Sequence, residues 1–193
     1  MNDSFRKNLY IKDVIQSAIK ACEIFSPCLE NFFNFELRHG YLGWENWLTV
    51  EIFRNLNSSA VVPFAPYSIC KKSLPGLMDL FVRYPNQIVV EIKTNYLDND
   101  ELGANSLKLH SRIKDDISKM NKVGNSIYQL LILAIVFESQ DGLEKYQNEL
   151  FDTTQLEVMD MNCKFYTVSS ASDHKVLLQA ISNADKLFNI EKK

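Results

Sequence analysis

The sequence predicts a single α/β domain of 193 residues, in which helices flank a mixed central sheet. Three observations predict this fold class. Apolar residues recur with helical spacing over residues 10–25 and 105–123. Runs rich in β-branched and aromatic residues occupy 77–82 and 88–93. Residues 128–137 are almost continuously apolar, which is typical of a central strand covered on both faces.

The first third of the chain is expected to be mostly helical. The first helix covers residues 10–25, and Pro27 ends or bends it. A second helix is expected from about Trp44 to Leu56. A short strand follows over 60–63, and Pro66 is expected to interrupt any extension of it.

The middle of the chain predicts a hairpin followed by a helix and a strand. A loop over 71–76 leads into a hairpin over 77–94, and a polar, acidic loop follows over 95–103. The helix over 105–123 then precedes the apolar strand over 128–137.

The end of the chain gives weaker patterns. A helix is expected over 141–151 and a last strand over 163–168. Asp173 is expected to cap a final helix that extends to about Phe188.

Three charged residues interrupt the apolar hairpin. If Pro85 lies at the centre of the turn Tyr84-Pro85-Asn86, Asp79 faces Glu91 and Leu77 faces Lys93 across the two strands. Because side chains alternate between faces, Asp79, Glu91 and Lys93 project from one side of the hairpin. Charges in such runs are costly unless they are paired or bind a metal. They form either a structural ion-pair cluster or a functional site.

This pattern resembles the signature of the PD-(D/E)XK nuclease superfamily, whose fold is called restriction-endonuclease-like. Met78-Asp79 followed by Glu91-Ile92-Lys93 carries the resemblance, with Met78 in the place of the usual proline. Similar proteins have a helix with an internal glutamate before the first strand, which Trp47-Leu48-Thr49-Val50-Glu51-Ile52 matches. They also have an Asp-apolar-x-Lys segment in the following helix, which Asp116-Ile117-Ser118-Lys119 matches.

The resemblance implies an αβββαβ core over residues 44–137, in which a mixed central sheet is flanked by helices. Residues 1–43 would be a helical N-terminal extension, and residues 138–193 an αβα completion of the domain.

The resemblance also implies a metal-dependent nuclease that hydrolyses phosphodiester bonds in DNA. Magnesium prefers oxygen ligands and retains waters, so Asp79 and Glu91 with a phosphate oxygen suit it, and manganese is expected to substitute. The backbone carbonyl of Ile92 is a further ligand implied by the resemblance. Lys93 would orient the attacking water, stabilise developing negative charge or act as a general base, and the sequence leaves these roles open.

Glu51 is the expected supporting acid from the second helix. Its alternatives are a solvated helix charge at Glu51 itself and a site role for Glu45, whose place near the helix start is also explained by the helix dipole. Asp116 and Lys119 are interpreted mainly as charges on a solvated helix face.

Basic residues around the hairpin would contact phosphates, or they are ordinary surface charges. They are Lys71, Lys72, Lys108, Arg112, Lys114, Lys119 and Lys122.

Composition limits the possible partners. The formal net charge is −3, so the protein is not expected to hold DNA by overall charge alone. The four separated cysteines have no zinc-ligand spacing and are expected to be free thiols. The N-terminus lacks an apolar signal segment and no apolar run could span a bilayer, which favours a cytoplasmic protein without membrane contact.

DNA is the expected partner, and a homodimer would suit cleavage of both strands of a duplex. The biological settings that fit are restriction, phage defence and processing of mobile elements. Two alternatives stay open. One is a catalytically silent module of the same fold that binds nucleic acid or a partner protein. The other is an interaction protein of an unrelated α/β fold.

Overall fold

The computed structural model describes residues 8–25, 43–97, 102–123, 127–139, 161–171 and 174–184. The helix predicted over 141–151 lies outside these ranges.

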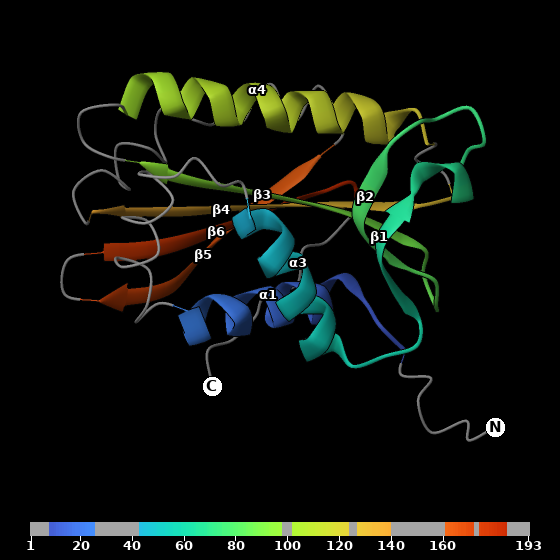
Figure 1. The fold of residues 1–193 in the computed structure, drawn as a ribbon, viewed down its shortest axis with the longest axis horizontal. Coiled ribbons are helices and arrows are strands. Elements are labelled where there is room, and N and C mark those ends of the chain that lie inside the picture. Colours follow the sequence, from blue (N-terminus) through green and yellow to red (C-terminus); the bar gives the residue numbers. More distant parts are fainter. Residues whose placement is uncertain are drawn as a thin grey trace.

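Six strands form one mixed sheet in the order β1-β2-β3-β4-β6-β5. Helix α4 covers one face of this sheet, and helices α1 and α3 cover the other (Figure 1). The helices are α1 (Ile11–Phe25), α3 (Gly43–Leu56) and α4 (Leu102–Asn121). The strands are β1 (Val61–Pro66), β2 (Leu77–Val82), β3 (Ile88–Leu97), β4 (Gln129–Ser139), β5 (Asn162–Ala171) and β6 (His174–Ser182). The mixed α/β class predicted from the sequence is confirmed at this level.

The sheet separates two hydrophobic cores. On the side of α1 and α3, Ile15 and Leu48 pack with residues such as Val90 of β3. On the other side, Ile113 and Ile117 of α4 pack over β3 and β4. Strand β4 is buried on both faces from Leu130 to Val136, which explains its nearly continuous apolar sequence.

The predicted hairpin has the expected register, but only next to its turn. Leu80 pairs with Val90, and Val82 pairs with Ile88. The expected pairings of Asp79 with Glu91 and of Leu77 with Lys93 are absent, because the register between β2 and β3 ends at Leu80 and Val90. On its other side, Leu77 pairs with Pro66 of β1. Strands β2 and β3 therefore stop pairing just beyond Leu80, and a fork opens between them.

Two strands are longer than predicted. Strand β1 continues through Pro66, although this proline was expected to interrupt it. Proline is tolerated there because β1 lies at the edge of the sheet. Strand β3 continues to Leu97, into the segment predicted as a loop, because parallel pairing with β4 extends as far as Leu97 and Glu138.

The final helix predicted from Asp173 to Phe188 is wrong over residues 174–182, which form strand β6. The strand predicted over 163–168 is therefore not the last. Leu177 and Ile181 are buried on the α4 side of the sheet and Leu178 on the other side. Strand β6 lies between β4 and β5, and these two neighbouring strands satisfy its backbone. A short apolar run buried on both faces resembles a buried helix in sequence, and long-range pairing decides between them.

Cys22, Cys70 and Cys163 are free thiols, as predicted, and Cys28 lies outside the described residues. Among the helices that the structure describes, none combines the length and apolar character needed to cross a bilayer.

Candidate active site

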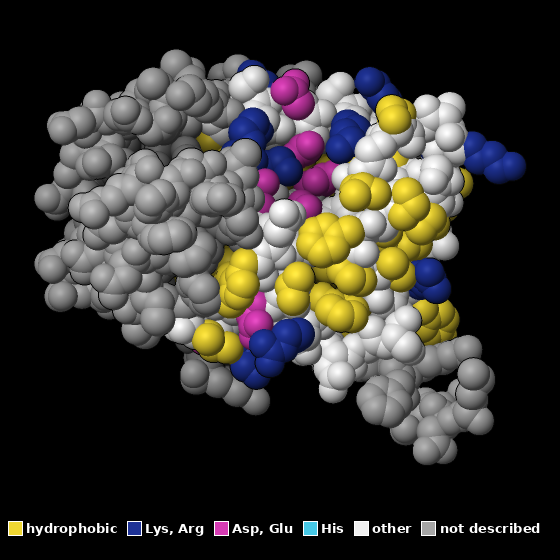
Figure 2. Space-filling view, viewed as in Figure 1, with side chains coloured by type: hydrophobic (Ala, Val, Ile, Leu, Met, Phe, Trp, Pro, Cys, Tyr) yellow, Lys and Arg dark blue, Asp and Glu magenta, His cyan; other side chains and the backbone are white. Residues whose placement is uncertain are grey.

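The charged residues of the hairpin gather where β2 and β3 separate. Oδ2 of Asp79 accepts a hydrogen bond from the backbone N–H of Ile92 at 2.6 Å, in place of a strand-to-strand bond. The first turn of α3, through Glu45, and the C-terminal half of α4, through Arg112, Asp116 and Lys119, border this fork. Figure 2 shows acidic side chains gathered below α4, with lysine and arginine side chains beside them and a hydrophobic area next to them.

Glu91 is the most buried member of the group, with 4% of its side chain exposed. Its Oε1 accepts a hydrogen bond from the hydroxyl of Tyr67, which lies in the 3₁₀ helix after β1. Nζ of Lys119 lies 3.5 Å from the same oxygen and 4.4 Å from the centre of the Tyr67 ring. An ammonium group over an aromatic face is attracted to it, so Tyr67 positions both Glu91 and Lys119.

Lys93 extends from β3 toward α4. Its Nζ lies 3.0 Å from Oδ2 of Asp116 and 3.6 Å from Oε2 of Glu91. The contact with Asp116 is an ion pair that lacks hydrogen-bond geometry. The ammonium instead donates a hydrogen bond to the carbonyl oxygen of Ile92 at 3.1 Å. Lys93 is therefore held between the sheet and α4.

Burial raises the pKa values of both carboxyl groups of the fork. It is the main cause for Asp79, whose bond from the Ile92 N–H acts in the opposite direction. The pKa of Glu91 is raised to about 7, first by burial and then by the charges of Asp79 and Asp116. Two carboxyl groups that both resist ionisation mark a place where an added cation would be stabilised.

Lys93 shows the opposite electrostatic balance. Burial alone would lower its pKa, but the carboxylates of Glu91, Asp116, Asp79 and Glu45 together raise the pKa above the ordinary lysine value. Lys93 is consequently an ammonium at neutral pH.

Glu45, rather than Glu51, is the acid of α3 that reaches the fork. Its Oε1 accepts a hydrogen bond from the backbone N–H of Thr94 at 3.2 Å and forms an ion pair with Arg112 of α4. Its charge also raises the pKa of Asp79. Glu51 is buried and forms an ion pair with Arg54, with 2.9 Å between Oε2 and the guanidinium.

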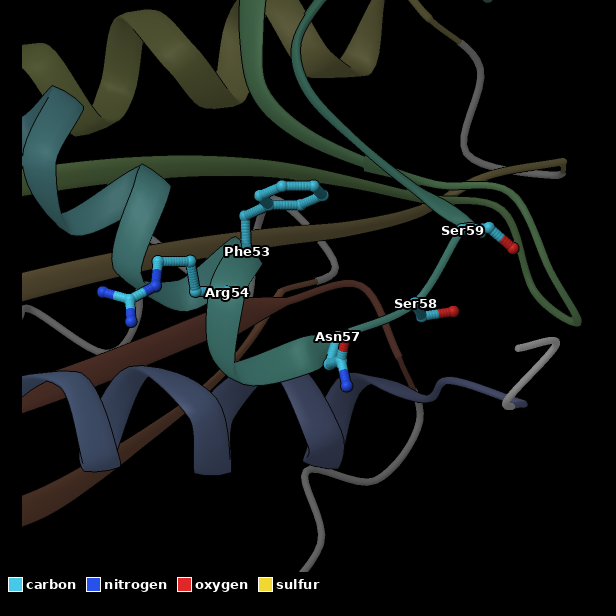
Figure 3. A pocket seen from close by; sticks show the side chains of 5 residues that line it. All are labelled: Phe53, Arg54, Asn57, Ser58 and Ser59. Atoms are coloured by element: carbon cyan, nitrogen blue, oxygen red, sulfur yellow. The ribbon is translucent and has the colours of Figure 1, made fainter. Parts of the chain in front are cut away.

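Helix geometry separates the two glutamates. Six residues of α-helix correspond to about 9 Å along the axis and to a rotation of about 240°. Glu51 therefore lies farther along α3 and on a different side of the helix. Its partner Arg54 lines a pocket together with Phe53, Asn57, Ser58 and Ser59. These side chains point in different directions and include no acidic group, so we do not assign this pocket a role in the site (Figure 3).

Three residues of the cluster were missed or discounted by the sequence analysis. Asp116 is buried and Lys119 contacts Glu91, so their interpretation as a solvated helix face is wrong. The Asp-apolar-x-Lys pattern was the available signal for both. No sequence pattern indicated Tyr67, because it lies 24 residues from Glu91 and only the fold brings the two side chains together.

The predicted basic rim is present only in part. Arg112 and Lys119 lie at the fork through their contacts with Glu45 and Glu91. Lys71 is exposed and donates a hydrogen bond to the carbonyl oxygen of Lys122 at 3.0 Å. Lys72 is exposed as well. The side chain of Lys108 lies outside the described part of the chain.

The oxygen donors of the fork fit a magnesium ion with few protein ligands. Within the described ranges, no three His, Cys, Asp or Glu side chains converge to hold a metal. Magnesium usually keeps several waters and takes only one or two carboxylates together with substrate phosphate. Asp79 and Glu91 could supply two carboxylates, and the carbonyl of Ile92, here bonded to Lys93, could supply a third oxygen.

Charge balance agrees with this fit. The cluster contains four carboxylates, of Glu45, Asp79, Glu91 and Asp116, against three cations, of Lys93, Arg112 and Lys119. When all are ionised, one net negative charge remains. A divalent cation would make the cluster positive by one charge, which complements a single phosphodiester.

Comparison of the chain with models of known protein families, with curated proteins and with solved structures finds no match.

Proposed function

We propose that this protein is a magnesium-dependent nuclease with a restriction-endonuclease-like core, which hydrolyses phosphodiester bonds in DNA. The observation that carries the proposal is the meeting of Asp79, Glu91 and Lys93 at the fork between β2 and β3. A buried and a half-buried carboxylate beside an ammonium are suited to hold a cation and a phosphate together.

The chain topology supports the proposal. Helix α3, the antiparallel strands β1, β2 and β3, helix α4 and strand β4 follow one another, and β4 is parallel to β3. This is the αβββαβ order that the resemblance implies for residues 44–137. Asp79 and Glu91 both lie where β2 and β3 separate, and Lys119 of α4 contacts Glu91 there.

Asp79 and Glu91 would hold the magnesium ion, with the Ile92 carbonyl as a further ligand. The bound ion supplies an acidified water as nucleophile and neutralises charge on the scissile phosphate. Tyr67 fixes the rotamer of Glu91, and the Ile92 N–H fixes that of Asp79. Glu45 orients Arg112 at the mouth of the fork.

Lys93 would act as an ammonium group. Its raised pKa favours a charged side chain, which stabilises negative charge that develops on the phosphate and orients the attacking water. A general base would need a lowered pKa, so that role is disfavoured among those the sequence left open.

The test is cleavage of fluorescent DNA and RNA oligonucleotides by the wild type and by the variants Asp79→Asn and Lys93→Ala. We expect cleavage by the wild type with Mg²⁺ or Mn²⁺ and none with EDTA. Each variant should lose about 100-fold or more, the usual effect of removing one group that stabilises the transition state. Circular dichroism would verify that the variants are folded.

Asp115→Asn is the matched control, because Asp115 precedes Asp116 on α4 and is exposed. It should cleave like the wild type. Equal cleavage by the wild type and both site variants would show that the site is misassigned.

A catalytically silent module is the second candidate function. It is favoured by the contacts that Glu91 already makes with Tyr67, Lys93 and Lys119, which give a self-sufficient ion-pair cluster. Calorimetric titration with Mg²⁺, with and without DNA, separates the two candidates. Binding of Mg²⁺ that depends on Asp79 supports the nuclease, and DNA binding with no cation binding supports the silent module.

A further inference from the structure

Phe64 has a backbone conformation that a bulky residue rarely adopts. Its φ is +51°, in the left-handed region, which costs a non-glycine residue free energy unless the surroundings maintain it. Phe64 is 37% exposed and belongs to neither hydrophobic core. Packing of the core therefore does not account for a phenylalanine at this position.

The position of Phe64 in the sheet links it to the candidate active site. The register of β1 with β2 pairs Pro63 with Leu80 and Ala65 with Met78, so Phe64 lies across from Asp79. This is the one position within that run at which the ladder is interrupted. Opposed residues in antiparallel strands are about 5 Å apart between their Cα atoms.

In both β1 and β2, the alternation of side chains between the two faces of the sheet is interrupted at this position. Val61 and Leu80 pack on the α1 and α3 side, and simple alternation would put Ala65 and Met78 there too. Both instead pack on the α4 side. The bend at Phe64 and Asp79 therefore turns Asp79 into the fork and leaves an aromatic ring exposed at the neighbouring edge of the sheet.

We propose that Phe64 is a stacking platform for an unpaired base of a nucleic acid strand whose phosphate lies at Asp79, Glu91 and Lys93. The inference rests on the proposed function and adds a substrate class to it, single-stranded or locally unpaired nucleic acid. Proteins usually bind single strands with a positively charged site for the phosphates and with aromatic side chains on which the bases stack. Bases within a duplex are covered by their stacked neighbours and offer no free face.

Charge favours this occupant over an apolar partner. With a divalent cation bound, the fork would carry one net positive charge, which would attract a phosphate and which an apolar protein surface would leave unbalanced. A strand that crosses from the fork to the edge of the sheet would bring its base against Phe64.

The experiment uses Phe64→Gly, which removes the ring and suits the left-handed backbone. Its unfolding midpoint should equal or exceed that of the wild type. Phe64→Asn also tolerates this conformation and serves as a second ring-free variant. Phe64→Trp should retain binding because it keeps an aromatic face. Tyr84→Ala, which removes a 55% exposed ring at the β2–β3 turn, is the matched control and should bind normally.

Binding is measured by fluorescence anisotropy with 12-nucleotide single strands that carry one abasic site at each position in turn. Ca²⁺ replaces Mg²⁺ to slow hydrolysis, and gels verify that the strands stay intact. For the wild type, one abasic position should weaken binding by about 5- to 100-fold, the range for base–aromatic stacking. Phe64→Gly should lose a similar factor with the intact strand and should show no position dependence.

The outcomes distinguish the inference from the function on which it rests. If the wild type cleaves DNA but Phe64→Gly keeps the same position dependence, or if the wild type binds duplex as tightly as single strand, stacking on Phe64 is refuted and the nuclease proposal stands. Position-dependent binding without any cleavage supports the platform on a silent module. A wild type that neither binds nor cleaves any strand overturns both.

Discussion

Glu91 couples the site to pH at the scale of a single residue. Its pKa in the folded protein is about 7, against an ordinary value of 4.5. A carboxyl group with a raised pKa stabilises the fold below its unfolded pKa, and this contribution is lost as the pH rises through the folded pKa. The relevant window is therefore about pH 4.5 to 7, and Lys93 titrates well above it.

We predict that the wild type loses up to about 3 kcal/mol of stability relative to Glu91→Gln between pH 5 and pH 8. The glutamine variant has no charge to desolvate, so its own stability changes less over that window. Urea unfolding in EDTA at several pH values measures the difference. A difference that stays constant from pH 5 to pH 8 would show that Glu91 titrates normally.

Sequence reasoning at the residue scale worked best where neighbours in space are neighbours in sequence. Asp79, Glu91 and Lys93 lie on two strands joined by one short turn, so the turn and the alternation of side chains grouped them, although the pairing of Asp79 with Glu91 that this reasoning assumed is absent. Tyr67 and Asp116 join the same cluster from separate elements. No local sequence pattern indicates that these residues lie close to Glu91 and Lys93. Tyr67 was therefore not anticipated, and Asp116 was discounted.

At the scale of elements, the choice between Glu45 and Glu51 depends on how α3 is rotated and placed against the sheet. The sequence shows both residues on one helix, and the resemblance favoured Glu51. In the fold, the N-terminal turn of α3 approaches β3, and Glu45 bonds to Thr94. Glu51 is instead paired with Arg54.

We predict that Glu45→Gln lowers cleavage more than Glu51→Gln does. Loss of the Glu45 charge releases Arg112 and removes a carboxylate that raises the pKa of Lys93, so we expect an effect of about 10-fold. Glu51→Gln should change the rate by less than about twofold. Rates of oligonucleotide cleavage measure both variants, with denaturation curves as the control for folding. The reverse order of effects would restore Glu51 to the site.

The element boundaries that failed share one cause. Strand β6 and the extended ends of β1 and β3 exist because partner strands satisfy their backbone hydrogen bonds. Helical patterns such as α1 and α4 were predicted well because helices bond within themselves. Strand pairing is a long-range property, and the sequence of one segment does not reveal its neighbours.

At the scale of the whole molecule, a cation at the fork would connect β2 with β3 and relieve the repulsion between their carboxylates. Any ligand that binds the folded state alone raises the free energy of unfolding. The stabilisation is about 2.7 kcal/mol when the free ligand is at 100 times its dissociation constant.

We predict that Mn²⁺ or Mg²⁺ raises the unfolding temperature of the wild type by about 5–11 °C at such a concentration. Asp79→Asn should show little of this shift, and Asp115→Asn should show all of it. Differential scanning calorimetry measures the three proteins with the metal or with EDTA. An equal shift in the wild type and Asp79→Asn would mean that the cation binds elsewhere.

The sequence by itself determined the α/β class, the hairpin and the three charged residues on one of its faces. These follow from periodicities of 2 and 3.6 residues, which are local. Only the tertiary structure decided that β2 and β3 separate at Asp79, that Glu45 and Asp116 join the fork, and that Phe64 lies beside it. These features depend on how distant segments pack and pair, and that packing is fixed by the whole chain rather than by any one pattern within it.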